Sequence, residues 1–540
     1  MLMNKSGKAN IVANDISFDV GNGVFIIKDL SLSLSNEKSG LVGLNGIGKT
    51  TLLRLLVGEL EPTQGEILKN SNIAYLPQDY LLDPNQTIAE ALGIKDKLEA
   101  LAKVKAKEGG SKTLESIAQD WGIENRVLKN FEKLNFKNPD FSRRLDTLSG
   151  GEKMKVIIVK LLISKPDFII LDEPTNNLDL ASRQTIYQLV RDWNKGLLVV
   201  SHDRNLLNLL SQILELTPKG LKLYGGNYDS YKTQKTLKEE AQGRHLVSAT
   251  EDLQKIRQQA QKTKEKQEKR SATGKKSREK GGQPKMVLNT MKSWSESTSS
   301  KLKKMHKEKI EDAEKRFKEA KDSISLKNKI NVDLSNTQVP KGKLVVEMKG
   351  VSFSYTGSKD LFKNFSLKIH GPARLAIKGP NGSGKTTLIR LLLGKLKPTS
   401  GEVILGVDRW AYLDQSVFLL DKEKNLFKNL ENISKLDRDL SRRWLARFLF
   451  RDKAALKDIS VLSGGERMRA ALACILAGEE PPQLLVLDEP TNNLDLDSIE
   501  QIESALLNFR GALLVISHDD KFLENIGIEG EIDLNKSLKV

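Results

Sequence analysis

The chain has 540 residues, of which 39% are hydrophobic, so it is long enough for two or three domains that each bury a core. Its formal net charge of +17 favours a polyanionic partner, such as a nucleic acid or an anionic membrane surface. The one cysteine, Cys474, excludes an internal disulfide, a zinc site made of several cysteines and an iron–sulfur cluster. We interpret Cys474 as a small buried hydrophobic residue.

The apolar residues do not gather into a membrane segment. No run approaches the roughly 18 consecutive apolar residues that a transmembrane helix requires, and the N-terminal stretch lacks the apolar centre of a secretory signal. We therefore expect a cytoplasmic protein without a membrane span.

Four motifs occur twice in the same order, which predicts a duplicated domain. The pairs are GLNGIGKT at 43–50 with GPNGSGKT at 379–386, LSGGE at 148–152 with 462–466, LDEPTNNLDL at 171–180 with 487–496, and SHD at 201–203 with 517–519. We assign residues 1–231 to a first copy and residues 341–540 to a second copy.

In each copy an apolar run leads into a glycine-rich loop and then a helix-forming segment, the context of a phosphate-binding loop. Glycines let backbone amides surround phosphate oxygens, the lysine reaches the β and γ phosphates, and the following threonine holds Mg²⁺. The predicted ATP-binding residues are Gly43, Leu44, Asn45, Gly46, Ile47, Gly48, Lys49, Thr50 and Thr51, and Gly379, Pro380, Asn381, Gly382, Ser383, Gly384, Lys385, Thr386 and Thr387.

One glutamine lies downstream of the glycine-rich loop in each copy. Gln78 and Gln415 each end a strand-like stretch and suit contact with Mg²⁺ or with the attacking water.

The first copy is longer than the second. The lysines of the two loops are 336 positions apart, whereas the glutamates of the LDEP motifs are 316 apart, so the first copy carries about 20 extra residues. We place these residues between Gln78 and Leu148.

The apolar runs FIILDE and LLVLDE each end in two adjacent carboxylates. Asp172 and Asp488 are predicted to bind in the Mg²⁺ shell, and Glu173 and Glu489 to orient and deprotonate the attacking water as general bases.

A histidine follows a further apolar run in each copy. A lone histidine is more often structural, but the same SHD context in both copies favours a functional role. We predict that His202 and His518 contact the γ-phosphate.

The segment between the copies, residues 232–340, is strongly basic. It holds 28 lysines and arginines against 15 acidic residues, a net of +13. Apolar residues recur there in steps of three and four, the spacing of a coiled-coil seam: Leu246, Ala249, Leu253, Ile256 and Ala260, then Ile310, Ala313, Phe317, Ala320 and Ile324.

We therefore predict two helices that form a coiled-coil hairpin, with the sequence loosening at 271–285 and a bend at about 281–294. A disordered charged linker is the alternative reading. The predicted fold class is α/β, with two tandem P-loop domains joined by this α-helical hairpin.

LSGGE is the motif that an ordinary P-loop enzyme does not need. With it, the chain resembles ATP-binding cassette proteins over about 20–231 and 344–530. That resemblance implies a head-to-tail pair in which each ATP lies between the loop of one copy and the LSGGE of the other. One site would then join Lys49, Thr50, Gln78, Asp172, Glu173 and His202 to Ser463, Gly464 and Gly465; the other would join Lys385, Thr386, Gln415, Asp488, Glu489 and His518 to Ser149, Gly150 and Gly151.

The resemblance also implies two competent sites, because both copies keep the glutamate, and an aromatic residue that stacks on adenine. Tyr355 in VSFSY holds this stacking position in the second copy. The aligned residue in the first copy is Val20, where Phe18 or Phe25 would have to substitute.

Two cassettes on one chain, the basic linker, TNNLD after the glutamate and YGGNYDSY at 224–231 together resemble the ABC-F subfamily of ribosome-associated ATPases. This implies binding to rRNA and tRNA near the exit site of the 50S subunit, with the linker directed at peptidyl-tRNA or the peptidyl transferase centre. It also implies that the extra residues of the first copy form a short arm, at about 93–121, that contacts the stalk region. Members act as translation factors or protect ribosomes from antibiotics. We expect a monomer whose cassettes pair within the chain.

Three alternative functions stay open at this stage. They are the ATPase subunit of a membrane transporter, a DNA-associated ABC ATPase, and a nucleic-acid binder without turnover.

Overall fold

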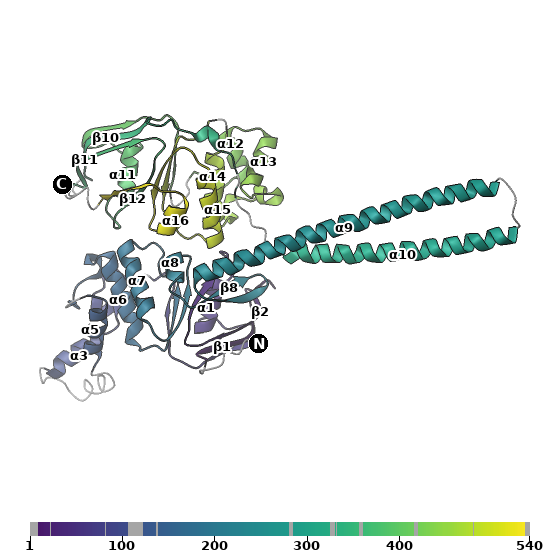
Figure 1. The fold of residues 1–540 in the computed structure, drawn as a ribbon. Coiled ribbons are helices and arrows are strands. Elements are labelled where there is room, and N and C mark those ends of the chain that lie inside the picture. The colour runs from purple at the N-terminus through teal and green to yellow at the C-terminus, as the bar shows by residue number, and fades with distance from the viewer. Residues whose placement is uncertain are drawn as a thin grey trace. The chain divides into compact units, whose positions relative to one another are not determined.

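The computed structural model describes residues 9–21, 23–80, 83–105, 122–136, 139–279, 285–323, 330, 332–355, 360–414, 419–478 and 480–534. The chain divides into two compact units, one made of Met1–Asp229 with Asn328–Val540 and the other of Ser230–Lys327. The first unit holds both copies of the repeat, and the second holds most of the basic segment between them (Figure 1).

The first copy is an α/β domain with two sheets. Its elements are β1 (Ile11–Asp19), β2 (Phe25–Leu34), β3 (Lys38–Val42), α1 (Lys49–Val57), β4 (Gln64–Lys69), β5 (Ile73–Leu76), α2 (Ile88–Ala91), α3 (Lys95–Lys105), α5 (Ile123–Lys133), α6 (Gly150–Ile163), β6 (Phe168–Asp172), α7 (Leu180–Asp192), β7 (Gly196–Val200), α8 (Arg204–Leu207), β8 (Gln212–Thr217) and β9 (Gly220–Gly225). Of the predicted arm at 93–121, α3 is described and residues 106–121 lie outside the described residues.

The larger sheet of the first copy has the strand order β5-β6-β7-β3-β8-β9, in which only β9 is antiparallel to its neighbour. Every residue of β6 and β7 is buried, because helices cover both faces of a parallel sheet, and these strands accordingly read as continuous apolar runs. The smaller sheet, β2-β1-β4, is antiparallel. The chain segments that leave β3, β6 and β7 at their carboxyl ends all emerge at one edge of the larger sheet, where α/β folds bind ligands.

The second copy repeats this plan. Its elements are β10 (Leu344–Phe353), β11 (Phe362–His370), β12 (Arg374–Lys378), α11 (Lys385–Leu392), β13 (Ser400–Leu405), β14 (Trp410–Leu413), α12 (Leu426–Ser434), α13 (Arg438–Arg447), α14 (Gly464–Ile475), β15 (Leu484–Asp488), α15 (Leu496–Leu507), β16 (Ala512–Ile516), α16 (Asp520–Asn525) and β17 (Gly530–Asp533). The sheets run β14-β15-β16-β12-β17 and β11-β10-β13, in the same relative order as in the first copy.

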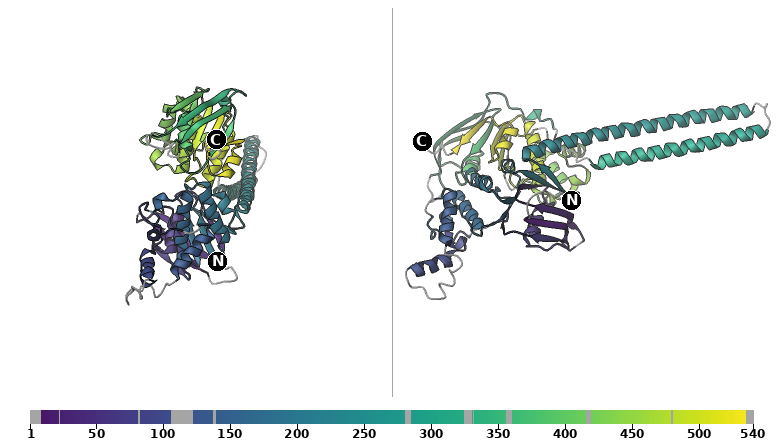
Figure 2. Two further views of the ribbon diagram at one scale, coloured as in Figure 1. Left: turned by 90° about the vertical axis from the view of Figure 1, so that its left-hand side faces the viewer. Right: turned by 60° about the horizontal axis from the view of Figure 1, so that its bottom comes forward.

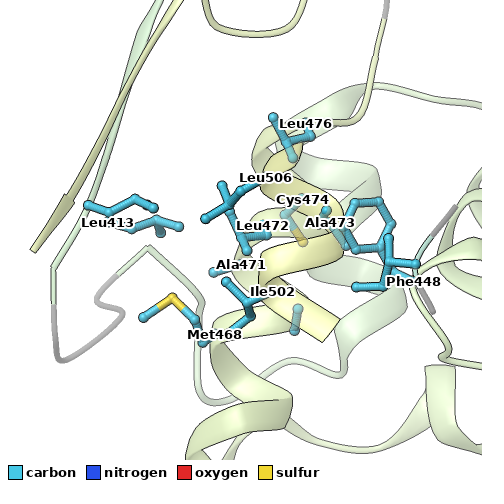
Figure 3. Close-up of a cluster of buried hydrophobic side chains, with 14 of the residues drawn as sticks. Leu413, Phe448, Met468, Ala471, Leu472, Ala473, Cys474, Leu476, Ile502 and Leu506 are labelled. Atoms are coloured by element: carbon cyan, nitrogen blue, oxygen red, sulfur yellow. The ribbon is translucent and has the colours of Figure 1, made fainter. Parts of the chain in front are cut away.

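The core of the second copy contains the cysteine. Cys474 on α14 is fully buried beside Phe448, Leu472, Ile502 and Leu506, as Figure 3 shows. Burial raises the pKa of its thiol to about 12. The prediction that Cys474 is a buried hydrophobic residue is confirmed.

The second unit contains two long helices, α9 (Tyr228–Glu279, 52 residues) and α10 (Lys285–Ser323, 39 residues), which we call the hairpin. They lie side by side in both Figure 1 and Figure 2. Leu253 on α9 and Ala313 and Ala320 on α10 are buried, and the other described residues of the predicted apolar stripe are half-buried. Arg257 Nη2 lies 2.6 Å from Glu314 Oε1 across the pair. The stripe therefore faces the neighbouring helix.

The predicted loosening of the sequence at 271–285 is wrong, because α9 continues to Glu279 and α10 begins at Lys285. Serine, threonine and glycine cost a few tenths to about 1 kcal/mol each in a helix, which is little once a long helix is already nucleated. The predicted bend at 281–294 is likewise too long, since residues 285–294 are helical. Residues 280–284 lie outside the described residues.

Within the described ranges, no helix combines the length and apolar character that crossing a bilayer requires.

Candidate active sites

The loop between β3 and α1 has the backbone shape of a phosphate cradle. Gly48, the residue before α1, has φ +101°, and a Cβ at this position would lie 2.6 Å from the side chain of Ile26, so only glycine fits. The buried Lys49 Nζ donates to the carbonyl oxygens of Gly43 (2.8 Å) and Leu44 (3.2 Å) and to Asn45 Oδ1 (3.3 Å). The ammonium group therefore lies inside the curve of its own loop.

The loop between β12 and α11 repeats this geometry. Gly384 has φ +90°, and a Cβ there would lie 2.9 Å from Leu361. Lys385 Nζ donates to the carbonyl oxygens of Gly379 (2.8 Å) and Pro380 (3.0 Å). The remaining predicted loop residues lie in the same two segments: Gly46, Ile47, Thr50 and Thr51 in the first copy, and Asn381, Gly382, Ser383, Thr386 and Thr387 in the second.

The paired carboxylates stand at the ends of β6 and β15. Asp172 is fully buried, and burial raises its pKa, although the Thr50 hydroxyl and Lys49 act against this rise. In the second copy, Asp488 Oδ2 accepts hydrogen bonds from Thr386 Oγ1 (3.0 Å) and from the hydroxyl of Tyr412 on β14 (3.1 Å). The threonine and aspartate predicted to share Mg²⁺ are thus neighbours in both copies.

The two glutamates have left-handed backbones, with φ +47° at Glu173 and +49° at Glu489, which is uncommon for a residue other than glycine. Each amide donates to the strand beside it, to Val200 O and Ile516 O respectively, at 2.9 Å. Such strain persists where the surrounding structure fixes it, and it recurs at functional sites.

Burial raises the pKa of Glu173 to about 8 and that of Glu489 to about 7, although Lys49 opposes the first rise and Arg183 and Lys385 oppose the second. A carboxylate with a pKa near neutrality is the stronger base that proton abstraction from water requires.

Each predicted histidine lies beside its glutamate. His202 Nε2 is 3.2 Å from Glu173 Oε1, and His518 Nε2 is 3.5 Å from Glu489 Oε1. Burial lowers the pKa of His202 to about 3 and that of His518 to about 4, so both imidazoles are neutral and neither contact is an ion pair.

Three further predicted residues have different outcomes. Gln78 is exposed and follows β5, which pairs with β6, so it lies at the same sheet edge as Asp172. Gln415 lies outside the described residues. Tyr355 lies beside the second loop, because its hydroxyl oxygen is 3.1 Å from Thr387 Oγ1.

The first copy offers no aromatic residue at the position of Tyr355. Val20 is exposed, and Phe18 packs against the core of the first copy. Phe25 is 40% exposed on β2 and is therefore the freer of the two phenylalanines considered as substitutes.

The LSGGE motifs each begin a helix. Ser149 and Ser463 are the N-caps of α6 and α14, and each forms a capping box with the glutamate three residues later, Glu152 or Glu466. Gly150 and Gly464 are the first residues of these helices, followed by Gly151 and Gly465. A helix N-terminus of this kind attracts anions.

The two copies contact each other where the predicted glycine-rich loops meet residues that the sequence analysis did not assign to a site. The amide of Asn45 donates to Asp495 Oδ2 (2.9 Å), and its side chain donates to Asn493 O (2.9 Å). In the reverse direction, Asn381 Nδ2 donates to Asn177 O (3.4 Å). Each glycine-rich loop is therefore joined to the LDEPTNNLDL segment of the other copy.

In the second copy, the same segment lies beside the LSGGE helix. A Cβ at Gly464 would lie 3.5 Å from Asn493 O, the atom that accepts from Asn45. The LSGGE of the second copy is thus close to the loop of the first. The identical repetition of TNNLDL in both copies is the sequence signal from which this role could have been found.

The residues present fit ATP with Mg²⁺. Both loops provide glycine backbone and a lysine, and each has a threonine beside an aspartate, which are oxygen ligands of the kind Mg²⁺ takes. Among the described residues, the Glu173 carboxylate, His202 Nδ1 and Ser383 Oγ are buried without a hydrogen-bond partner of good geometry. Buried polar atoms of this kind normally have a partner, such as bound water or a ligand.

Comparison with known proteins identifies the family. The family described as ABC transporter matches residues 27–176 and 362–492. ATP-binding protein Uup of Haemophilus influenzae is 33% identical over 93% of this chain and 76% of its own length. ABC transporter F family member 5 of Arabidopsis thaliana is 30% identical, with 93% and 72% covered. Energy-dependent translational throttle protein EttA of Haemophilus influenzae is 32% identical, with 93% and 88% covered.

Among solved structures, one described as RNase-L Inhibitor aligns with a TM-score of 0.53 at 20% identity, covering 96% of this chain and 86% of that one, which shows a shared fold. The duplicated loops, the glutamates that follow β6 and β15, and near full-length similarity to F family members lead to one conclusion. The chain is an ATPase and belongs to the ABC-F family of ATP-binding cassette proteins.

Proposed function

We propose that this protein is a ribosome-associated ATPase that acts on translation. The main observation behind this proposal is the basic hairpin between the two cassettes. In addition, 93% of this chain aligns at 32% identity with a translational throttle protein. A helical pair with a large positive charge suits an RNA surface, because phosphates attract lysine and arginine whatever the base sequence.

The exposed faces of the hairpin supply this charge. Lys255 on α9 and Lys307 on α10 have side chains that are 68% and 78% exposed. Lys301 and Lys304 on α10 are exposed as well. In this proposal these lysines contact rRNA near the exit site of the 50S subunit, and the end of the hairpin acts on peptidyl-tRNA or the peptidyl transferase centre.

The ATP sites supply the driving step. Each ATP would lie between the loop of one copy and the LSGGE helix of the other, where Lys49 or Lys385 neutralises the phosphates. Mg²⁺, held by Thr50 and Asp172 or by Thr386 and Asp488, would offset the charge that develops during hydrolysis. Glu173 and Glu489 accept the proton of the attacking water, and each neutral histidine donates a hydrogen bond to the γ-phosphate.

Closure of the two copies around ATP would then move the hairpin relative to the cassettes. The protein would act as a monomer in the cytoplasm, either as a translation factor or as a protection factor against antibiotics. The competing functions are the ATPase subunit of a membrane transporter and a DNA-associated ATPase. The first predicts that the purified chain binds membranes, and the second that it binds DNA.

The experiment is sedimentation of the full chain with ribosomes over a salt series. A variant with Lys301, Lys304 and Lys307 changed to glutamine should bind more weakly and with a flatter salt dependence, because each lysine that pairs with a phosphate adds about one unit to the log–log slope. The control carries the same charge change outside the hairpin, at the exposed Lys165, Lys349 and Lys363. Co-fractionation with membranes or DNA but not with ribosomes would contradict the proposal.

A further inference from the structure

The two ATP sites differ at a position three residues after the repeated motif. LDEPTNNLDL is identical in both copies, and the offset of 316 between Glu173 and Glu489 places Arg183 of the first copy opposite Ile499 of the second. Both residues lie in the helix that begins after the motif, α7 or α15. An arginine and an isoleucine differ completely in what they offer to a polar interface.

Arg183 connects the two copies. Its side chain is only 9% exposed. Within its own copy, Nε donates to Leu178 O at 3.0 Å, and Nη1 lies 3.9 Å from Asp203 Oδ2. Nη1 also donates to the main-chain oxygen of His518, in the second copy, at 3.3 Å. One guanidinium thus joins the LDL turn and the SHD segment of the first copy to the catalytic histidine of the second.

The equivalent link is missing in the other direction. Ile499 is 2% exposed and packs in the core of the second copy, and an isoleucine has no donor to offer the carbonyl of His202. The first site therefore lacks this particular tie to the second copy.

A second pair of equivalent positions differs in the same sense. Arg204 of the first copy forms a buried ion pair with Glu503 of the second. At the corresponding positions stand Asp520 and Tyr187, and Tyr187 instead donates its hydroxyl proton to Asp203 within its own copy. Asp520 pairs with Lys378, also within its own copy. The interface is thus asymmetric at two independent places.

We propose that Arg183 is a positioning residue of the second ATP site. Through Arg183 the second site depends on contact with the first copy, whereas the first site has no equivalent arginine from the second copy. The carbonyl that Arg183 binds belongs to His518 itself, so the bond fixes the orientation of that peptide and with it the imidazole beside Glu489. A bond from a charged donor is stronger than a neutral one, and it breaks whenever the two copies separate. The second site is therefore assembled fully only in the closed chain.

This inference concerns the ATP sites alone and rests on the assignment of their residues, not on ribosome binding. The test therefore measures ATP hydrolysis by the full chain without ribosomes. Glu173→Gln leaves the second site to hydrolyse ATP, and Glu489→Gln leaves the first. Arg183→Ile, which copies the residue at 499, is placed in each background.

We expect Arg183→Ile to lower kcat about tenfold in the Glu173→Gln background, with KM changed by less than about twofold, because the substitution removes a charge-assisted hydrogen bond that acts after ATP has bound. In the Glu489→Gln background kcat should change by less than about twofold. Where Arg183→Ile lowers the thermal midpoint, Arg183→Lys is the second variant, since it keeps the charge but not the forked donor. Its loss of activity must again be confined to the Glu173→Gln background. Equal losses of activity in both backgrounds, or no loss in either, would overturn the proposal.

Discussion

Arg204 Nη1 lies 2.6 Å from Glu503 Oε1, and both side chains are buried, at 3% and 8% exposure. The two residues are 299 positions apart and belong to different copies of the cassette. A buried charge without its partner is expensive, so this pair forces the two copies to meet in one register.

Removing one member of this pair should weaken the closed arrangement more than removing both. Replacing one partner of a buried ion pair typically costs about 3–5 kcal/mol, whereas an apolar pair of similar volume is often nearly neutral. We expect Arg204→Met and Glu503→Met each to lower kcat/KM for ATP, and the double variant to recover part of the loss. The exposed pair Lys195–Asp167 is the control, because exposed pairs contribute little. Strictly additive effects in the cycle would show that the pair does not couple the copies.

Substitution of an LSGGE serine should impair the site of the other copy. Ser149→Arg places a long cation at the start of α6 and should reduce photolabelling by azido-ATP at the loop containing Lys385. Ser463→Arg is the matched variant and should affect the loop containing Lys49. Peptide mapping after labelling separates the two loops, and loss of label from the loop of the mutated copy alone would contradict the head-to-tail arrangement.

The packing of the hairpin should depend on its inner stripe. Leu253 is 7% exposed, whereas Val247 on the same helix is 59% exposed. Leu253→Ala should destabilise the pair by about 2–5 kcal/mol, the range for truncating a buried leucine, and Val247→Ala by much less. Limited proteolysis of the full chain should show faster cleavage within the hairpin only for Leu253→Ala. Similar cleavage rates for the two variants would mean that the helices do not support each other.

Hydrolysis should not lose activity through histidine protonation near neutral pH. Burial lowers the pKa of His518 from 6.5 to about 4, so the neutral form persists well below the pH at which a free histidine becomes charged. We expect the plot of kcat against pH for the Glu173→Gln variant, in which only the second site works, to show no histidine titration near pH 6.5. Any inflection that is present near this pH should therefore remain when His518→Gln is added. An inflection that His518→Gln abolishes would mean that His518 titrates as an exposed histidine does.

Much of the site was predictable from the sequence because its functional residues belong to short local motifs. Lys49, Asp172, Glu173 and His202 each follow an apolar run, and parallel strands bring such positions to one edge of a sheet. The repeat then supplied the second set of residues without further reasoning. The left-handed φ of Glu173 was not predictable, because no local sequence motif encodes it and its amide bonds to Val200 on a strand distant in the sequence.

The contacts between the two copies could not be predicted from the sequence, for a different reason. Charged residues such as Arg204, Glu503 and Arg183 are usually exposed, so the sequence did not indicate that they would be buried and bonded between the copies. The end of α9 was misjudged because local propensity at 271–279 is outweighed by the continuing helix.

The central claim, a ribosome-associated ATPase with paired sites, is tested most directly with Glu173→Gln combined with Glu489→Gln. This variant should bind ATP but hydrolyse it about 10²–10⁴ times more slowly, because the general bases are gone. In ATP it should therefore sediment with ribosomes more strongly than the unmodified protein does, and in ADP it should not. Recovery of the variant only in the ribosome-free fraction, with ATP bound, would contradict the account.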